Sequence, residues 1–220
     1  ELGNTIGLYG AIPFLFSLGE NAASAGVFAL NPSSTFVDII KDENKRGVSS
    51  HWMHEVGLMD VFLIPGPTTK DVIQNYIHLT GKPMLAQYFS LAYHQCRWNY
   101  KDEEDVSQVD EKFDEYNIPY DVLWLDIEHT DGKKYFTWEK HDFPTPLDML
   151  QKIKAKGRKM VTITDPHIKR ESGYFVHDEA ESKGYYVKNK DGNSFEGDCW
   201  PGKSSWLDFF SPEVRAWYAS

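Results

Sequence analysis

Apolar residues in the first part of the chain occur in short runs separated by turn-forming residues. Short runs of β-branched and aromatic residues between such turns are typical of strands. They predict strands at residues 6–15, 26–30, 35–40 and 58–64, with a polar hairpin loop at 41–50. Four closely spaced strands indicate part of an antiparallel β-sandwich. A helix is predicted at residues 69–80, capped by Thr69 and ended by Gly81.

After Pro83 the pattern changes to alternating strands and helices. The predicted strands are residues 88–94, 121–126 and 160–164. Helices are predicted to start after Asp102, after Thr145 and after Ser211, and the third helix continues towards Ser220 without a stop signal. Residues 166–206 are expected to be largely irregular. The alternation predicts right-handed βαβ units and a parallel sheet, but it does not separate a barrel from a doubly wound sheet.

Charge and composition exclude some classes of function. The net charge is −10 and Lys and Arg form no cluster, which argues against nucleic-acid binding. The longest apolar runs, such as Ala11–Leu18, are too short to span a bilayer, so no membrane span is expected. Cys96 and Cys199 lie far apart without a CxxC partner, which predicts two free, buried thiols and no zinc or redox motif.

Polar and aromatic residues follow each of the three strands predicted after Pro83. They occupy residues 93–100, 124–129 and 164–168. Because the carboxyl ends of parallel strands lie at one edge of a sheet, these segments are expected to converge. Carboxylates accept hydrogen bonds from hydroxyl groups and aromatic rings stack on the C–H faces of sugars, so the mixture favours a carbohydrate site. Each residue alone also fits a structural role, as an N-cap Asp, a buried His or a packed Trp.

A metal site is not expected. The sequence His51-x-x-His54-Glu55 has a spacing that suggests metal ligands, but known helical zinc motifs place the Glu between the two His residues. No third ligand is near in sequence, so these residues are predicted to lie on the surface.

Four segments together resemble glycoside hydrolase family 31, the family of retaining α-glucosidases. They are residues 93–100, 124–138, 165–168 and 196–202, in a consistent order along the chain. The resemblance implies an α/β fold in which residues 83–220 form the first three strand–helix units of a (β/α)8 TIM barrel, with an irregular insertion at about 166–206. Residues 1–82 would be the end of an antiparallel β-sandwich plus a linking helix.

The resemblance also implies roles for single residues. Asp126 would accept hydrogen bonds from glucose hydroxyls in the −1 subsite, and Trp98 and Leu123 would line the same pocket. Trp200 would be an aromatic platform near the +1 subsite. Asp165 and His167 would be pocket or supporting residues. No cofactor is implied.

The family's nucleophile lies in a Trp-x-Asp-Met-Asn-Glu motif on the fourth barrel strand, and this motif is absent between Glu1 and Ser220. Both the nucleophile and the acid are therefore expected after Ser220, in a longer parent protein. Asp126 and Glu128 share a face and offer an alternative pair of carboxylates, although the family uses the first of them for binding.

The implied activity is removal of α-linked glucose from oligosaccharides, as in N-glycan trimming in the endoplasmic reticulum lumen. A regulatory β subunit is an expected partner by resemblance. Two alternatives remain: a cytosolic neutral α-glucosidase acting on glucan oligosaccharides, and a chain that binds carbohydrate without cleaving it.

Overall fold

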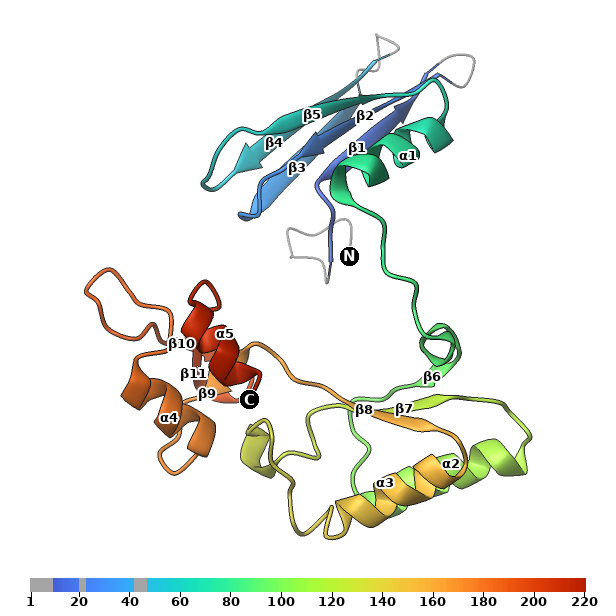
Figure 1. The fold of residues 1–220 in the computed structure, drawn as a ribbon, viewed down its shortest axis with the longest axis vertical. Helices are drawn as coiled ribbons and strands as arrows, with labels where there is room; N and C mark the ends of the chain where they lie inside the picture. The colour runs from blue at the N-terminus through green and yellow to red at the C-terminus, as the bar shows by residue number, and fades with distance from the viewer. Residues whose placement is uncertain (1–9, 20–22, 42–46) are drawn as a thin grey trace. The chain divides into compact units, whose positions relative to one another are not determined.

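The structure is a computed structural model that describes residues 10–19, 23–41 and 47–220. The chain divides into two compact units, Glu1–Leu85 and Ala86–Ser220 (Figure 1). The boundary lies close to the predicted one after residue 82. Within the described residues, no helix is both long and apolar enough to cross a membrane.

The first unit contains two antiparallel sheets. One has the order β1-β2-β5, from β1 (Phe14–Leu18), β2 (Ser24–Ala29) and β5 (Val61–Pro65). The other is the pair β3 (Thr35–Lys41) and β4 (Val48–His54). The strands predicted at 26–30, 35–40 and 58–64 are thus confirmed, whereas the strand predicted at 6–15 lies partly outside the described residues. A complete sandwich stays a prediction.

Strand β4 corrects the prediction of a loop at residues 41–50. Its sequence is Val48-Ser-Ser-His-Trp-Met-His54, which lacks the apolar run that marks a strand, and it is held by full pairing with β3. His51 and His54 are three residues apart on this strand, so their side chains point to opposite faces and cannot chelate one ion.

Helix α1 (Thr69–Thr80) covers the three-stranded sheet. Its N-cap is Thr68, one residue before the predicted cap, because Thr68 and Asp71 form a reciprocal capping box. Tyr76 stacks on Phe14 with ring centroids 4.6 Å apart. The helix approaches β2 closely at Gly26, where a Cβ atom would lie 2.8 Å from Val72 Cγ1.

The second unit starts with a parallel sheet of order β6-β7-β8, from β6 (His94–Gln95), β7 (Val122–Leu125) and β8 (Lys159–Thr162). Helices α2 (Glu103–Glu115) and α3 (Pro146–Ala155) connect the strands and lie side by side on one face of the sheet (Figure 1). A buried cluster joins sheet and helices: Tyr100, Val106, Tyr120, Leu123, Leu125, Phe143 and Met149.

Two predictions in this unit are wrong: the strand at residues 88–94 and the irregular segment at residues 166–206. Residues 88–94 are not one strand, since Tyr88–Leu91 form the 3-10 helix η2 and only His94–Gln95 pair with β7. Tyr88 and Leu91 are exposed, and without a partner strand their β propensity is not realised.

Residues 166–206, predicted to be largely irregular, contain one helix and three strands. These are β9 (His167–Lys169), α4 (Phe175–Lys183), β10 (Gly197–Cys199) and β11 (Gly202–Trp206). The three strands form an antiparallel sheet of order β10-β11-β9. We call residues 167–206 the excursion. Helix α5 (Pro212–Tyr218) follows it, capped by Ser211 as predicted.

The excursion has its own core. Its members within the excursion are Ile168, Tyr174, Val176, Ala180, Tyr185 and Tyr186. This core also includes Leu207 and, on α5, Val214, which both follow the excursion, and it shares no residue with the cluster between sheet and helices. The second unit is therefore stabilised by two separate apolar clusters.

Candidate functional site

Alternation along β7 determines which residues face the site. Leu123 and Leu125 are buried among helix-side residues, whereas Trp124 points to the other face and donates from Nε1 to His94 Nδ1 over 2.9 Å. Asp126 continues the face of Trp124 and is half-buried at the strand end.

Leu123 is correspondingly not part of this face. It is fully buried in the helix-side cluster, so the structure does not bring it together with the other predicted site residues. The prediction that Leu123 lines the pocket is therefore corrected. Leu123 and Asp126 are three residues apart, and an odd spacing along an extended strand puts the two side chains on opposite faces.

The loop after β7 is fixed by local hydrogen bonds. His129 Nδ1 lies 2.7 Å from the Asp126 carbonyl oxygen, and Thr130 Oγ1 donates to the Ile127 carbonyl over 2.7 Å. Burial raises the pKa of the Asp126 carboxyl; the nearby Asp165 carboxylate adds to this, while the Ile127 N–H opposes it. An acceptor held in a partly desolvated position is suited to take hydrogen bonds from a ligand.

Trp98 lies after β6 and is 64% exposed. Its Nε1 donates to Glu128 Oε1 over 3.1 Å, which connects the end of β6 to the end of β7. A cavity of about 400 Å³ adjoins this contact, lined by Trp98, Asn99, Lys101, Glu128 and Asp142. The predicted convergence of the first two strand ends is therefore present.

The third strand end joins them through Asp165. Its Oδ2 accepts hydrogen bonds from Tyr135 Oη over 2.7 Å and from Trp200 Nε1 over 3.3 Å. Trp200 lies in the turn between β10 and β11 and is 44% exposed. One carboxylate thus holds the indole of the excursion's tryptophan against the end of the parallel sheet.

His167 supports the same tryptophan. It is 4% exposed, and its ring is edge-on to Trp200 with centroids 4.9 Å apart and 5.5 Å from Tyr135. Burial lowers the pKa of His167, so the ring is neutral at pH 7. Its Nε2 has no hydrogen-bond partner among the described residues.

Two residues of this site were missed by sequence analysis. Tyr135 donates to Asp165, and Lys133 forms an ion pair with Glu128 at 2.6 Å while its Nζ lies 5.9 Å from the Trp200 ring centroid. Both belong to the segment 124–138 that the sequence analysis used as one block, and nothing in their identity marked them separately. Only the folded loop brings them to the site.

The geometry argues against Asp126 and Glu128 as a catalytic pair. Glu128 Oε1 accepts hydrogen bonds from both Lys133 and Trp98, so this carboxylate is held by structural partners. A nucleophile must direct an oxygen at the reacting carbon, whereas these two contacts orient the Glu128 carboxylate towards Lys133 and Trp98. What the site offers is carboxylate acceptor oxygens together with two partly exposed indole rings, which is chemistry for binding polyhydroxylated ligands.

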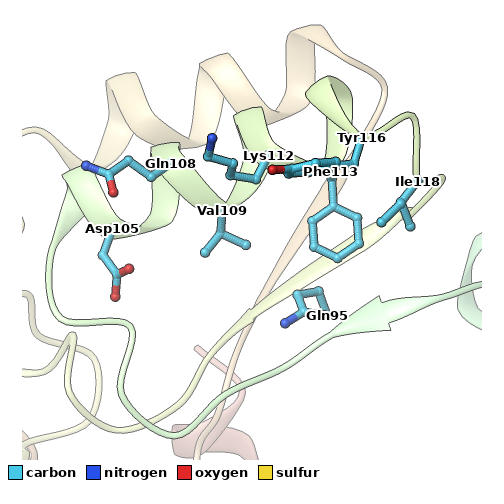
Figure 2. Close-up of a pocket in the computed structure, with 8 residues that line it drawn as sticks. All are labelled: Gln95, Asp105, Gln108, Val109, Lys112, Phe113, Tyr116 and Ile118. Atoms are coloured by element: carbon cyan, nitrogen blue, oxygen red, sulfur yellow. The ribbon is translucent and has the colours of Figure 1, made fainter.

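The two cysteines and the cavity beside α2 give no further groups to this site. Cys96 and Cys199 are free, but Cys96 is exposed and Cys199 half-buried, so the prediction of buried thiols is wrong. Burial raises the pKa of the Cys96 thiol, with a smaller contribution from Asp126. A cavity of about 340 Å³ between α2 and β6, into which Val109 and Phe113 point, is on the helix side of the sheet with Gln95 (Figure 2).

Among the described residues, one group could place three metal-ligating atoms close together: Glu139, His141 and Asp142. His141 and Asp142 are bonded to each other over 2.7 Å, and Glu139 accepts backbone N–H groups from both. These contacts satisfy the side chains as a surface turn, so they give no reason to assign an ion.

Comparison with known proteins places this geometry in a family. The model for "Glycosyl hydrolases family 31 TIM-barrel domain" matches residues 83–220. Neutral alpha-glucosidase AB of Dictyostelium discoideum is 56% identical over 222 residues, covering 100% of this chain and 23% of that protein. A probable glucan 1,3-alpha-glucosidase of Arabidopsis thaliana is 54% identical over 223 residues, covering 96% of this chain and 24% of that protein.

Solved structures agree. The crystal structure of an ER glucosidase II heterodimeric complex, consisting of the catalytic subunit and the binding domain of the regulatory subunit, matches with a TM-score of 0.87 and 51% identity. That match covers 96% of this chain and 24% of the solved chain. A GH31 dextranase of Flavobacterium johnsoniae has a TM-score of 0.81 at 30% identity, covering 98% of this chain and 26% of its own. The chain spans about a quarter of the length of these relatives, and it belongs to glycoside hydrolase family 31.

Proposed function

We propose that this chain is the glucose-binding part of a retaining α-glucosidase. The observation that carries the proposal is the convergence of three strand ends on one site. Trp98 donates to Glu128 there, Trp200 donates to Asp165, and both carboxylates act on the pKa of Asp126. The close relatives named neutral alpha-glucosidase and glucosidase II support the same activity.

Each residue has a role that its contacts allow. Asp126 accepts hydrogen bonds from glucose hydroxyls, because its carboxylate is half-buried and burial outweighs the hydrogen bond from Ile127 N–H, which lowers its pKa. Trp98 and Trp200 offer ring faces to the sugar. Asp165 and His167 act on the sugar through Trp200, since Asp165 holds its Nε1 and His167 contacts its ring.

The nucleophile and the acid are proposed to lie in other segments of a longer protein. A retaining glycosidase needs two carboxyl groups about 5–5.5 Å apart across the scissile bond. The Trp-x-Asp-Met-Asn-Glu motif does not occur in residues 1–220, and Glu128 is held by Lys133 and Trp98. This chain would therefore bind glucose without cleaving it until the remaining barrel is present.

The proposed substrate is an oligosaccharide with α-linked glucose, as in N-glycan trimming. One solved relative is an ER glucosidase II complex with a regulatory subunit, and another is described as bound to Glc1Man2. This likeness supports our proposal of an endoplasmic reticulum lumen location and a regulatory β subunit as partner. A cytosolic enzyme acting on glucan oligosaccharides is the alternative, since neutral alpha-glucosidase C of Homo sapiens is 47% identical over 239 residues.

The test is hydrolysis of an aryl α-glucoside by a full-length protein that contains this chain. Release of the aryl group, with α-glucose as the first product in a time-resolved NMR spectrum, is the expected result. The separate chain of residues 1–220 is expected to be inactive. Turnover by that separate chain would revive Asp126 and Glu128 as a catalytic pair.

A second candidate is a chain that binds carbohydrate without cleaving it. The binding groups at the three strand ends are sufficient for it, since Asp126, Asp165 and the two tryptophans need no catalytic carboxylate to hold a sugar. Glucose binding measured by calorimetry on a full-length protein that hydrolyses no α-glucoside would decide for this candidate.

A further inference from the structure

The two sides of the candidate site rest on different apolar clusters. Trp98 and Asp126 follow strands β6 and β7, which pack on α2 and α3. Trp200 belongs to the excursion, whose cluster is built on Ile168, Tyr186 and their neighbours. Neither cluster alone determines the position of one indole relative to the other, so contacts between the two sides must do so.

Lys133 makes such a contact. Its Nζ lies 2.6 Å from Glu128 Oε1, the same oxygen that accepts the Trp98 Nε1 hydrogen at 3.1 Å. The same ammonium lies 5.9 Å from the ring centroid of Trp200. A cation at this distance from an indole is attracted to the ring face. Glu128 and Lys133 therefore form a continuous polar link from one tryptophan to the other.

The backbone around Lys133 is held in an unfavourable conformation to reach this position. Lys133 has φ 67°, in the left-handed region that residues with a Cβ atom seldom adopt. The loop is anchored on both sides, since Lys169 Nζ donates to the Gly132 carbonyl over 2.8 Å and Lys134 pairs with Glu171 at 3.1 Å. A strained residue kept in place by its surroundings is a reason to look for function.

The ion pair has little to contribute to folding. The side chains of Lys133 and Glu128 are 32% and 35% exposed, and ion pairs with this much solvent access stabilise proteins only weakly. The ion pair instead affects the positions of the two indoles. Glu128 accepts the hydrogen bond from Trp98, and Lys133 attracts the ring of Trp200.

We propose that Glu128 and Lys133 are positioning residues that hold Trp98 and Trp200 in the orientations required to bind the sugar substrate. This inference rests on the proposed function of the site. It predicts that breaking the link weakens binding of the sugar in the ground state and the transition state alike, which raises KM and leaves kcat nearly unchanged.

The experiment uses the full-length protein and the substitution Lys133→Met. Met removes the charge, has an unbranched side chain of similar length, and is as unfavourable as Lys in the left-handed backbone conformation at this position. Lys133→Arg serves as the conservative variant. Lys183→Met is the matched control, because Lys183 also pairs with a Glu at 2.6 Å and lies 5.6 Å from an aromatic ring, that of Tyr185, but belongs to α4 outside the site.

For Lys133→Met we expect KM for an aryl α-glucoside to rise about five- to twentyfold, with kcat within about threefold of the unmodified protein. Calorimetry should show a matching loss of glucose affinity, Lys133→Arg should recover most of it, and Lys183→Met should bind normally. Equal KM values for Lys133→Met and Lys183→Met would overturn the inference. So would a fall in kcat with unchanged KM, or equal losses in both Lys133 variants together with a lower Tm. An unmodified protein that neither binds glucose nor hydrolyses the glucoside would instead refute the proposed function.

Discussion

Replacing Asp126 with Asn removes one charge from the candidate site while keeping the size of the side chain. The amide presents N–H donors where the carboxylate presented an acceptor oxygen. A hydrogen bond from a hydroxyl to a charged acceptor contributes about 1.5–3 kcal/mol, and more is lost when a buried partner is left unsatisfied. We therefore expect kcat/KM of the full-length protein to fall at least about a hundredfold, equivalent to ~2.7 kcal/mol.

The same substitution is expected not to lower stability. The pKa of Asp126 is raised in the folded protein by burial and by neighbouring carboxylates. A group that binds its proton more tightly when folded destabilises the fold while ionised, at pH values above its unfolded pKa. Asn carries no charge and escapes this cost. The Tm of Asp126→Asn at pH 7 should therefore equal or exceed that of the unmodified protein.

The assay combines steady-state hydrolysis of an aryl α-glucoside with thermal unfolding. Asp198→Asn is the control, because Asp198 is a carboxylate of the same unit with 80% side-chain exposure that forms an ion pair with Lys203. Glu128→Gln should lose less than Asp126→Asn, since Glu128 acts through Trp98 and Lys133. Near-normal kcat/KM in Asp126→Asn, or a low Tm that explains its inactivity, would refute the reasoning.

Three further predictions concern stability and are measured by chemical or thermal unfolding. Gly26→Val should destabilise the first unit by about 1–3 kcal/mol, because even a Cβ atom at this position would lie 2.8 Å from Val72 Cγ1; no effect would show that α1 is free to move. Asp110→Asn should cost about 3 kcal/mol, since Asp110 is buried and accepts from Lys156, Arg158 and Tyr120; a loss similar to that of a surface pair would contradict this. Hydrogen bonds from Arg158 and Lys156 lower the pKa of Asp114 to about 2, so its stabilising effect is full above about pH 4 and is lost towards pH 2. Asp114→Asn should accordingly flatten the acid-induced fall in Tm over that range.

The elements predictable from sequence are those in which a local signal agrees with tertiary packing. Residues 122–125 are a near-continuous apolar run, and Val122, Leu123 and Leu125 are buried in β7. Asp102 and Ser211 cap their helices with side-chain hydrogen bonds. The strands of the excursion lack such a signal. Ser204 and Ser205 are fully buried, and Ser205 is bonded to Phe195 and Arg170 instead of packing apolar surface.

The same distinction applies to the site. Asp126, Trp98, Trp200, Asp165 and His167 could be named from sequence because they follow strands or resemble family motifs, and their proposed roles await the experiments above. Lys133 could not, because its position depends on a left-handed backbone, on an ion pair with Glu128 and on a contact with Trp200 of the excursion. Leu123 was misplaced because the resemblance assigned a residue without regard to the alternation of β7.

The division of the second unit into two apolar clusters has a consequence for how such a protein diversifies. Residues that hold Asp126 are packed among α2, α3 and the parallel sheet, whereas Trp200 is carried by a sheet with a cluster of its own. Mutations in the excursion can reshape the outer side of the pocket without disturbing the packing beneath Asp126. If the proposed function is right, selection on ligand length or linkage can act on residues 167–206 while the packing around Asp126 stays unchanged.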